Sequence, residues 1–100
     1  MTNDARAIET LAAEIGDKVY IDVAKWHLYL EAAKLHVVVA ERLYPMLSDG
    51  CPNESQILQV LQDIPVALGG GKRELPLADL IPRQGLTDLT DILEEFKRQL

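Results

Sequence analysis

The stretch from Val19 to Leu47 constrains the fold most, because apolar side chains recur along it at helical spacing without a break. One set steps by three and four residues and comprises Val19, Val23, Trp26, Leu30, Ala33, Val37, Ala40, Tyr44 and Leu47. A second set, on the far side of the same cylinder, comprises Leu28, Ala32, Leu35, Val39, Leu43 and Met46. Only a narrow strip between them is polar, so the pattern predicts one long helix over residues 22–47, enclosed by other elements.

The start of this helix is open to a second interpretation. The segment VYIDV, residues 19–23, is rich in β-branched residues and could be extended before a helix begins at Asp22. The end is clearer, because Gly50 offers a left-handed stop and Pro52 cannot continue a helix.

Shorter helices are predicted on both sides of the long one. The first covers residues 4–15, with Gly16 as its C-terminal stop. The next follows Asn53, which can cap it together with Gln56 in a capping box, and it ends before Pro65.

The run of three glycines, Gly69–Gly71, raises the question of a phosphate loop. A phosphate loop needs a hydroxyl residue after its lysine, but Arg73 follows Lys72 here, so the motif fails. The glycines instead predict a β-hairpin that pairs residues 66–69 with residues 73–77. An anion or ligand contact through Lys72 and Arg73 is the alternative.

The C-terminal part completes the predicted architecture. Residues 77–85 are expected to be irregular or a single helical turn. A last helix, which Thr87 can cap, is expected to carry apolar residues at helical spacing to Leu100. The sequence therefore predicts a single domain over residues 1–100, mainly α with a small β component. A long central helix, three shorter helices and a two-stranded hairpin make it up.

Composition excludes several classes of function. The net charge is −6, which argues against nucleic acid and against anionic membranes, because both attract basic surfaces. No apolar run reaches the roughly 18 residues of a membrane span, and no targeting peptide is visible. Cys51 is the only cysteine, so no intramolecular disulfide can form, as is usual in a reducing compartment. We expect a cytoplasmic protein.

The two histidines give no clear chemical signature. His27 and His36 are nine residues apart, which is not the spacing of a helical metal site, so no metal and no cofactor are predicted. His27 is expected on the polar strip beside Glu31. His36 falls on apolar circumference, where it is either a hydrogen-bonded boundary histidine or, with Tyr29, part of a ligand pocket near the glycine turn. No nucleophile completes a catalytic set, which favours a protein that is not an enzyme.

Trp26, Tyr29 and Tyr44 fall on one side of the predicted long helix. Aromatic residues at helical spacing are usually core, but a face left uncovered would bind a partner. We therefore predict an interaction or assembly protein that contacts another protein, or a second copy of itself, through Trp26, Tyr29, Tyr44 and the hairpin residues Lys72 and Arg73. A small-molecule binder or minor enzyme around His36 is the alternative.

Two segments carry a resemblance to a known family. They are residues 7–47, above all YIDVAKWHLYL, and the turn LGGGKRELPLADLIP. In these segments the chain resembles a small family of uncharacterised proteins found in cyanobacteria, with plant relatives that look plastid-directed. The resemblance covers nearly the whole chain and implies a single-domain protein in the cytoplasm of a photosynthetic bacterium. It brings no known activity, cofactor or catalytic residue, so no site is carried over.

Overall fold

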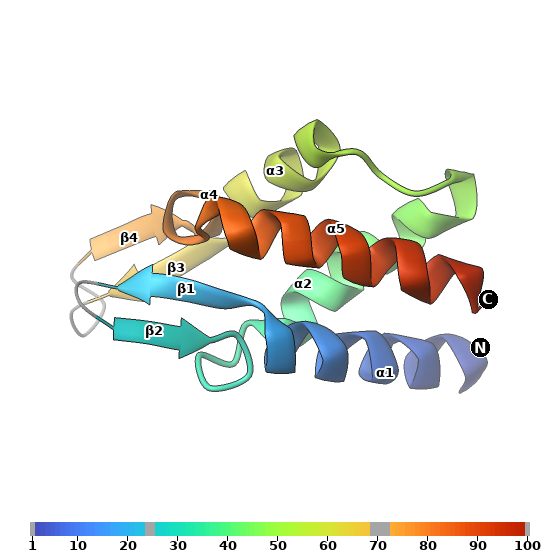
Figure 1. The fold of residues 1–100 in the computed structure, drawn as a ribbon. Helices are drawn as coiled ribbons and strands as arrows, with labels where there is room; N and C mark the ends of the chain where they lie inside the picture. The colour runs from blue at the N-terminus through green and yellow to red at the C-terminus, as the bar shows by residue number, and fades with distance from the viewer. Residues whose placement is uncertain (1, 24–25, 69–72, 100) are drawn as a thin grey trace.

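A computed structural model of the chain describes residues 2–23, 26–68 and 73–99, and within these it is mainly helical with two small antiparallel hairpins (Figure 1). The predicted fold class, mainly α with a small β component, is confirmed. In chain order the elements are α1 (Thr2–Lys18), β1 (Tyr20–Val23), β2 (Trp26–Tyr29), α2 (His36–Leu43), the 3₁₀ helix η1 (Tyr44–Asp49), α3 (Glu54–Gln62), β3 (Pro65–Leu68), β4 (Arg73–Pro76), α4 (Leu77–Leu80) and α5 (Arg83–Arg98).

The single long helix predicted over residues 22–47 is wrong. The structure divides this segment among β1, β2, a turn, α2 and η1. Strands β1 and β2 pair antiparallel, with Tyr20 opposite Tyr29. The second interpretation, an extended VYIDV segment, is therefore confirmed by β1.

The turn between β2 and α2 explains why the helical pattern misled. The Leu35 amide donates to the Leu30 carbonyl at 2.9 Å, and Lys34 adopts a φ of 61°, a left-handed conformation that a helix cannot contain. The Leu30 amide donates to the Val19 carbonyl at 3.0 Å, and both side chains are fully buried. The apolar residues that fit a helix face are thus buried by a hairpin and a turn instead.

Helix α1 does not stop at Gly16, as predicted, but continues to Lys18. Gly16 has a different role, because a Cβ at this position would lie 2.9 Å from Cβ of Glu31 and 3.0 Å from Cβ of His36. The Glu31 amide donates to the Gly16 carbonyl at 3.3 Å. The glycine therefore permits a close approach of α1 to the start of α2.

The other helix boundaries test the predicted caps. The capping box of α3 is confirmed, since the Asn53 side chain accepts from the Gln56 amide at 2.8 Å and the Gln56 side chain accepts from the Asn53 amide at 2.9 Å. The prediction that Thr87 caps the last helix is wrong, because Thr87 lies inside α5. Helix α5 begins one turn earlier, at Arg83, with the extended Pro82 as its N-cap residue.

The second hairpin is confirmed, with Val66 opposite Leu75 and Leu68 opposite Arg73. The glycine turn itself, residues 69–72, lies outside the described residues. The single helical turn expected after the hairpin is α4.

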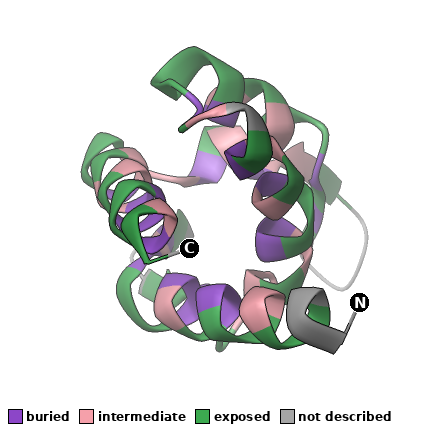
Figure 2. Ribbon diagram, turned by 90° about the vertical axis from the view of Figure 1, so that its right-hand side faces the viewer, coloured by how far each residue is buried: buried purple, intermediate pink, exposed green. Residues whose placement is uncertain are grey.

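The buried residues come from most of the elements, and in Figure 2 the stretches of ribbon that they occupy surround the interior. The largest of those that are fully buried are Leu11, Ile15, Val19, Ile21, Leu30, Leu43, Leu47, Ile57, Leu61, Leu77, Leu89 and Leu93. Helices α1 and α5 run along the length of the molecule, and both hairpins lie at the end opposite the chain termini (Figure 1). This arrangement leaves the outer side of the β1–β2 hairpin and the adjoining surfaces of α1 and α5 available for contact.

Candidate functional site

The three aromatic residues predicted to share one helix face are separated by the structure. Tyr29 ends β2 and is 48% exposed, whereas Tyr44 begins η1 and is half-buried, with its ring 6.2 Å from that of Phe96. Trp26 begins β2, and its side chain lies outside the part of the chain that the structure describes. Tyr44 therefore belongs to the packing against α5, and the predicted common face is wrong.

The predicted hairpin contacts are only partly placed. Arg73 is exposed at the start of β4, whereas Lys72 lies outside the described residues.

His36 is the first residue of α2, and its ring packs against Gly16 of α1. The Nδ1 atom is buried and has no hydrogen-bond partner among the residues that the structure describes. Tyr29 lines a nearby open depression of about 660 Å³ with Gly16, Asp17, Glu31, Ala32 and Lys34. His36 is not among the described residues that line this depression, so the pairing predicted for the ligand alternative is not formed there.

The outer side of the β1–β2 hairpin carries a cluster that the sequence analysis missed. In the antiparallel register Tyr20 lies opposite Tyr29 and Asp22 opposite His27, so these four side chains share one side of the hairpin. We call this set the aromatic face. The Tyr20 ring meets the His27 ring edge-on at 4.8 Å and lies 5.8 Å from the Tyr29 ring.

His27 also pairs within the aromatic face, rather than with Glu31 as a helix would require. Its Nδ1 atom lies 2.6 Å from Oδ1 of Asp22, a distance at which the ring N–H donates to the carboxylate. The pair is exposed to solvent, and it fixes the ring beside Tyr20. The alternation of YIDV and WHLY at period two was the signal that could have revealed this cluster.

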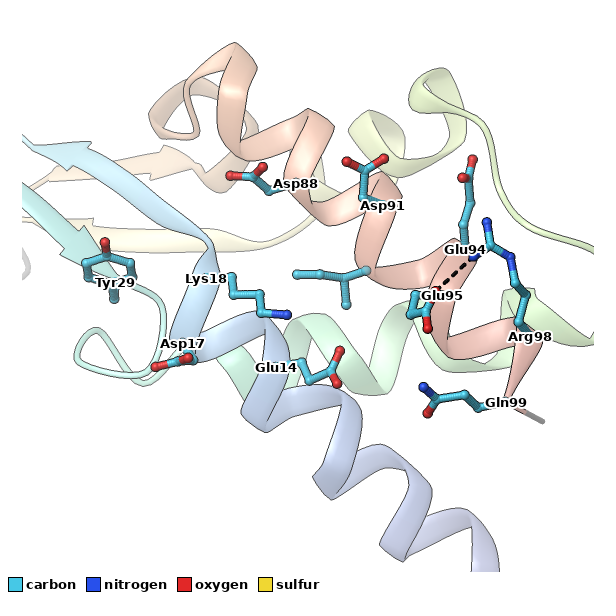
Figure 3. Close-up of a pocket in the computed structure, with 11 residues that line it drawn as sticks. Glu14, Asp17, Lys18, Tyr29, Asp88, Asp91, Glu94, Glu95, Arg98 and Gln99 are labelled. Atoms are coloured by element: carbon cyan, nitrogen blue, oxygen red, sulfur yellow. Dashed lines mark hydrogen bonds and ion pairs between the residues drawn. The ribbon is translucent and has the colours of Figure 1, made fainter.

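A groove between α1 and α5 continues from the aromatic face (Figure 3). Its volume is about 900 Å³, and it is largely open to solvent. Tyr29 lies at its hairpin end and Gln99 at its other end, as Figure 3 shows. We call it the acidic groove, and its lining residues are Glu14, Asp17, Lys18, Tyr29, Asp88, Asp91, Ile92, Glu94, Glu95, Arg98 and Gln99.

Charge in the acidic groove is strongly unbalanced. Six carboxylates line it against two cations, an excess of four negative charges. Arg98 is already engaged, because its guanidinium lies 2.8 Å from a carboxylate oxygen of Glu95 (Figure 3). The floor is apolar at Ile92, which is 5% exposed. This groove is therefore a negatively charged channel with an apolar base and an aromatic end.

Metal-ligating side chains and the single cysteine are the remaining candidate groups. Among residues 2–23, 26–68 and 73–99, no group of three or more histidine, cysteine or acidic side chains is arranged to hold a metal ion. Desolvation, and then the neighbouring Glu94 carboxylate, raise the pKa of the Cys51 thiol above its usual value. A raised pKa lowers the fraction of thiolate, the nucleophilic form, so Cys51 is a poor nucleophile.

Comparison with known proteins places the chain in a family. None of the helices in the described part of the chain is long and apolar enough to cross a membrane. No solved structure matches the chain. A curated relative, "Thylakoid-associated protein slr0729" of the cyanobacterium Synechocystis sp., is 41% identical over 97 residues, which cover 97% of this chain and 96% of that protein. The sequence profile of the family described as "Protein of unknown function (DUF3181)" matches residues 8–96, and the chain therefore belongs to this family.

Proposed function

We propose that the chain is a non-enzymatic interaction protein that acts at the thylakoid surface, where it binds another protein through the aromatic face and the acidic groove. The observation that carries this proposal is the exposed aromatic face that continues into the groove. The thylakoid location is taken from the name of the relative, which matches this chain along nearly its whole length.

The aromatic face has the composition of a binding surface. Tyrosine is enriched at the centres of protein interfaces, because its ring buries much area at little entropic cost and its hydroxyl still finds a partner. Tyr29 is 48% exposed although it lies in a regular strand. The contact between the Tyr20 and Tyr29 rings, together with the Asp22–His27 pair, holds these side chains in place before a partner arrives. A preorganised surface loses less side-chain entropy on binding.

The groove supports a macromolecular partner better than a small substrate. A small-molecule site usually encloses most of its ligand between apolar walls with a few polar groups. The acidic groove is open, and most of its lining residues are charged. A surface of this kind suits a segment of another protein that lies along it.

The proposal is tested by sedimentation with thylakoid membranes isolated from a cyanobacterium. The purified chain is mixed with intact membranes and with membranes stripped of exposed proteins by protease, and the fraction that sediments is measured. We expect sedimentation with intact membranes and its loss after protease treatment. Tyr29→Ala should reduce the bound fraction several-fold.

A matched control removes an exposed apolar side chain elsewhere. Val37 is 46% exposed on α2, outside both the aromatic face and the acidic groove, so Val37→Ala should sediment like the unchanged chain. Sedimentation that survives protease treatment, or no sedimentation with intact membranes, would refute the proposed function.

A further inference from the structure

We propose that the partner presents a basic segment, rich in arginine and lysine, which lies along the acidic groove and places one cation against the Tyr29 ring. This inference rests on the proposed function and specifies the chemistry of the partner. It is argued from the charges, the length and the aromatic end of the surface.

Apart from Glu95, which pairs with Arg98, the carboxylates of the groove have no ion pair among the described residues. Asp17 on α1 and Asp91 on α5 are both exposed, and neither has an ion pair or hydrogen bond from its side chain among the described residues. Both helices contribute carboxylates to the groove, which has an excess of four negative charges. A basic segment that lies along the groove would be attracted to carboxylates on both helices.

The surface also offers contacts for the rest of a long cationic side chain. Arginine and lysine bury their aliphatic stems on apolar surface while the charged head reaches a carboxylate. Ile92 supplies such a surface at the base of the groove. Tyr29 at the hairpin end offers a ring face, which attracts a cation through the quadrupole of the ring.

The length of the groove sets the size of the segment. From Asp88 to Gln99, α5 rises about 16 Å at 1.5 Å per residue. That distance matches about five residues of extended chain or about three turns of helix. A partner therefore needs only a short run with a few basic residues.

The same charges disfavour a lipid surface as the occupant. An anionic bilayer would meet a groove with an excess of four negative charges in a chain with a net charge of −6. Repulsion of this kind opposes contact, whereas basic peptide is attracted at long range. We therefore assign the surface to a basic protein segment rather than to lipid.

The test is fluorescence anisotropy with a labelled ten-residue peptide of alternating arginine and alanine, beside a glutamate–alanine peptide of equal length. The chain should bind the arginine peptide and not the glutamate peptide. Raising the salt from 0.1 M to 1 M shortens the screening length from about 10 Å to about 3 Å and should weaken binding at least several-fold.

Two double variants of equal net charge separate the groove from general acidity. Asp17→Asn with Asp91→Asn removes one carboxylate from each wall and should raise Kd by between about 2-fold and 30-fold, the range for two exposed ion pairs. Asp63→Asn with Asp79→Asn removes two exposed carboxylates outside the groove and should leave Kd within about 2-fold. Equal effects of the two double variants would overturn the assignment.

The ring contact is tested by paired substitutions of Tyr29. Tyr29→Leu keeps the apolar area but removes the ring. It should raise the Kd for the arginine peptide about 2-fold to 5-fold, the range of an exposed cation–π contact. Tyr29→Phe keeps the ring and should bind like the unchanged chain. An unaltered Kd in Tyr29→Leu would show that the Tyr29 ring does not contact the peptide.

A final set of measurements distinguishes failure of this inference from failure of the proposed function. Protein-free vesicles of anionic lipid should not bind the chain, and their binding would overturn the basic-segment assignment in favour of a membrane contact. Suppose that the chain sediments with thylakoids in a protease-sensitive manner but the Asp17/Asp91 double variant sediments equally well. The proposed function as an interaction protein is then supported, and the proposal of a basic partner segment is refuted. Loss of all sedimentation with retained peptide binding would instead refute the thylakoid role alone.

Discussion

Replacing Gly16 by alanine tests the close approach of α1 to the chain around α2. The added Cβ would lie 2.9 Å from Cβ of Glu31 and 3.0 Å from Cβ of His36. Carbon atoms prefer about 3.5–4.0 Å, so both neighbours must retreat by about half an ångström or more. Because both are Cβ atoms fixed to the backbone, a side-chain rotation cannot relieve the contact, and the turn before α2 must shift.

The expected loss of stability follows from two opposing effects. Overpacking a close contact costs about 1–3 kcal/mol, and the upper end applies where backbone must move. Alanine recovers about 1 kcal/mol of helix propensity relative to glycine, since Gly16 lies inside α1. We therefore expect Gly16→Ala to lower the free energy of unfolding by about 2 kcal/mol, or Tm by about 8–16 °C for a chain of this size.

The assay is urea denaturation followed by circular dichroism at 222 nm. Ala13→Gly provides the control, because Ala13 is exposed on the same helix and its change reports the propensity effect without a clash. It should cost about 1 kcal/mol. If Gly16→Ala leaves the free energy of unfolding unchanged or raises it, the close contact between α1 and residues 31–36 is not present in solution.

Two further predictions address the corrected fold and the lone thiol. Leu30→Ala should lower the free energy of unfolding by about 2–5 kcal/mol, since Leu30 is fully buried. Leu28→Ala should lower it by less than about 1 kcal/mol, because Leu28 is 38% exposed. Equal losses of the two variants in thermal denaturation would contradict the hairpin. Alkylation of Cys51 by iodoacetamide should have a pH midpoint above that of a cysteine peptide, since desolvation and Glu94 raise the thiol pKa. Glu94→Gln should lower this midpoint in part, and a midpoint at or below that of the peptide would contradict the raised pKa.

Local signals in the sequence predicted the parts of the fold that local interactions determine. The capping box at Asn53 and Gln56 and the pairing of β3 with β4 follow from short motifs, and both are present. Residues 19–47 fit two periods at once, because their apolar side chains satisfy helical spacing while YIDV and WHLY also alternate as strands. The choice between them depends on the turn at Lys34 and on contacts with α1. Those contacts are tertiary, and periodicity does not report them.

The candidate site was less accessible to sequence reasoning than the fold. The sequence analysis names Tyr29 as a partner-binding residue although aromatic residues at helical spacing are usually core, and the structure leaves its side chain 48% exposed. The Asp22–His27 pair was missed because a helix would have placed these side chains on different sides. The fold brings α1 beside α5, so carboxylates such as Asp17 and Asp91, more than seventy positions apart, line the same groove. Only the folded chain joins them.

The two hairpins form separate sheets, so in the described structure each strand has a partner on one side only. A two-stranded ribbon is marginal by itself, and anchors such as Ile21 and Val66 hold each one to the interior. The hairpins can consequently open one at a time, in local events far smaller than global unfolding. A ligand on the first hairpin would slow amide hydrogen exchange in β1 and β2 while β3 and β4 continue at their own rate.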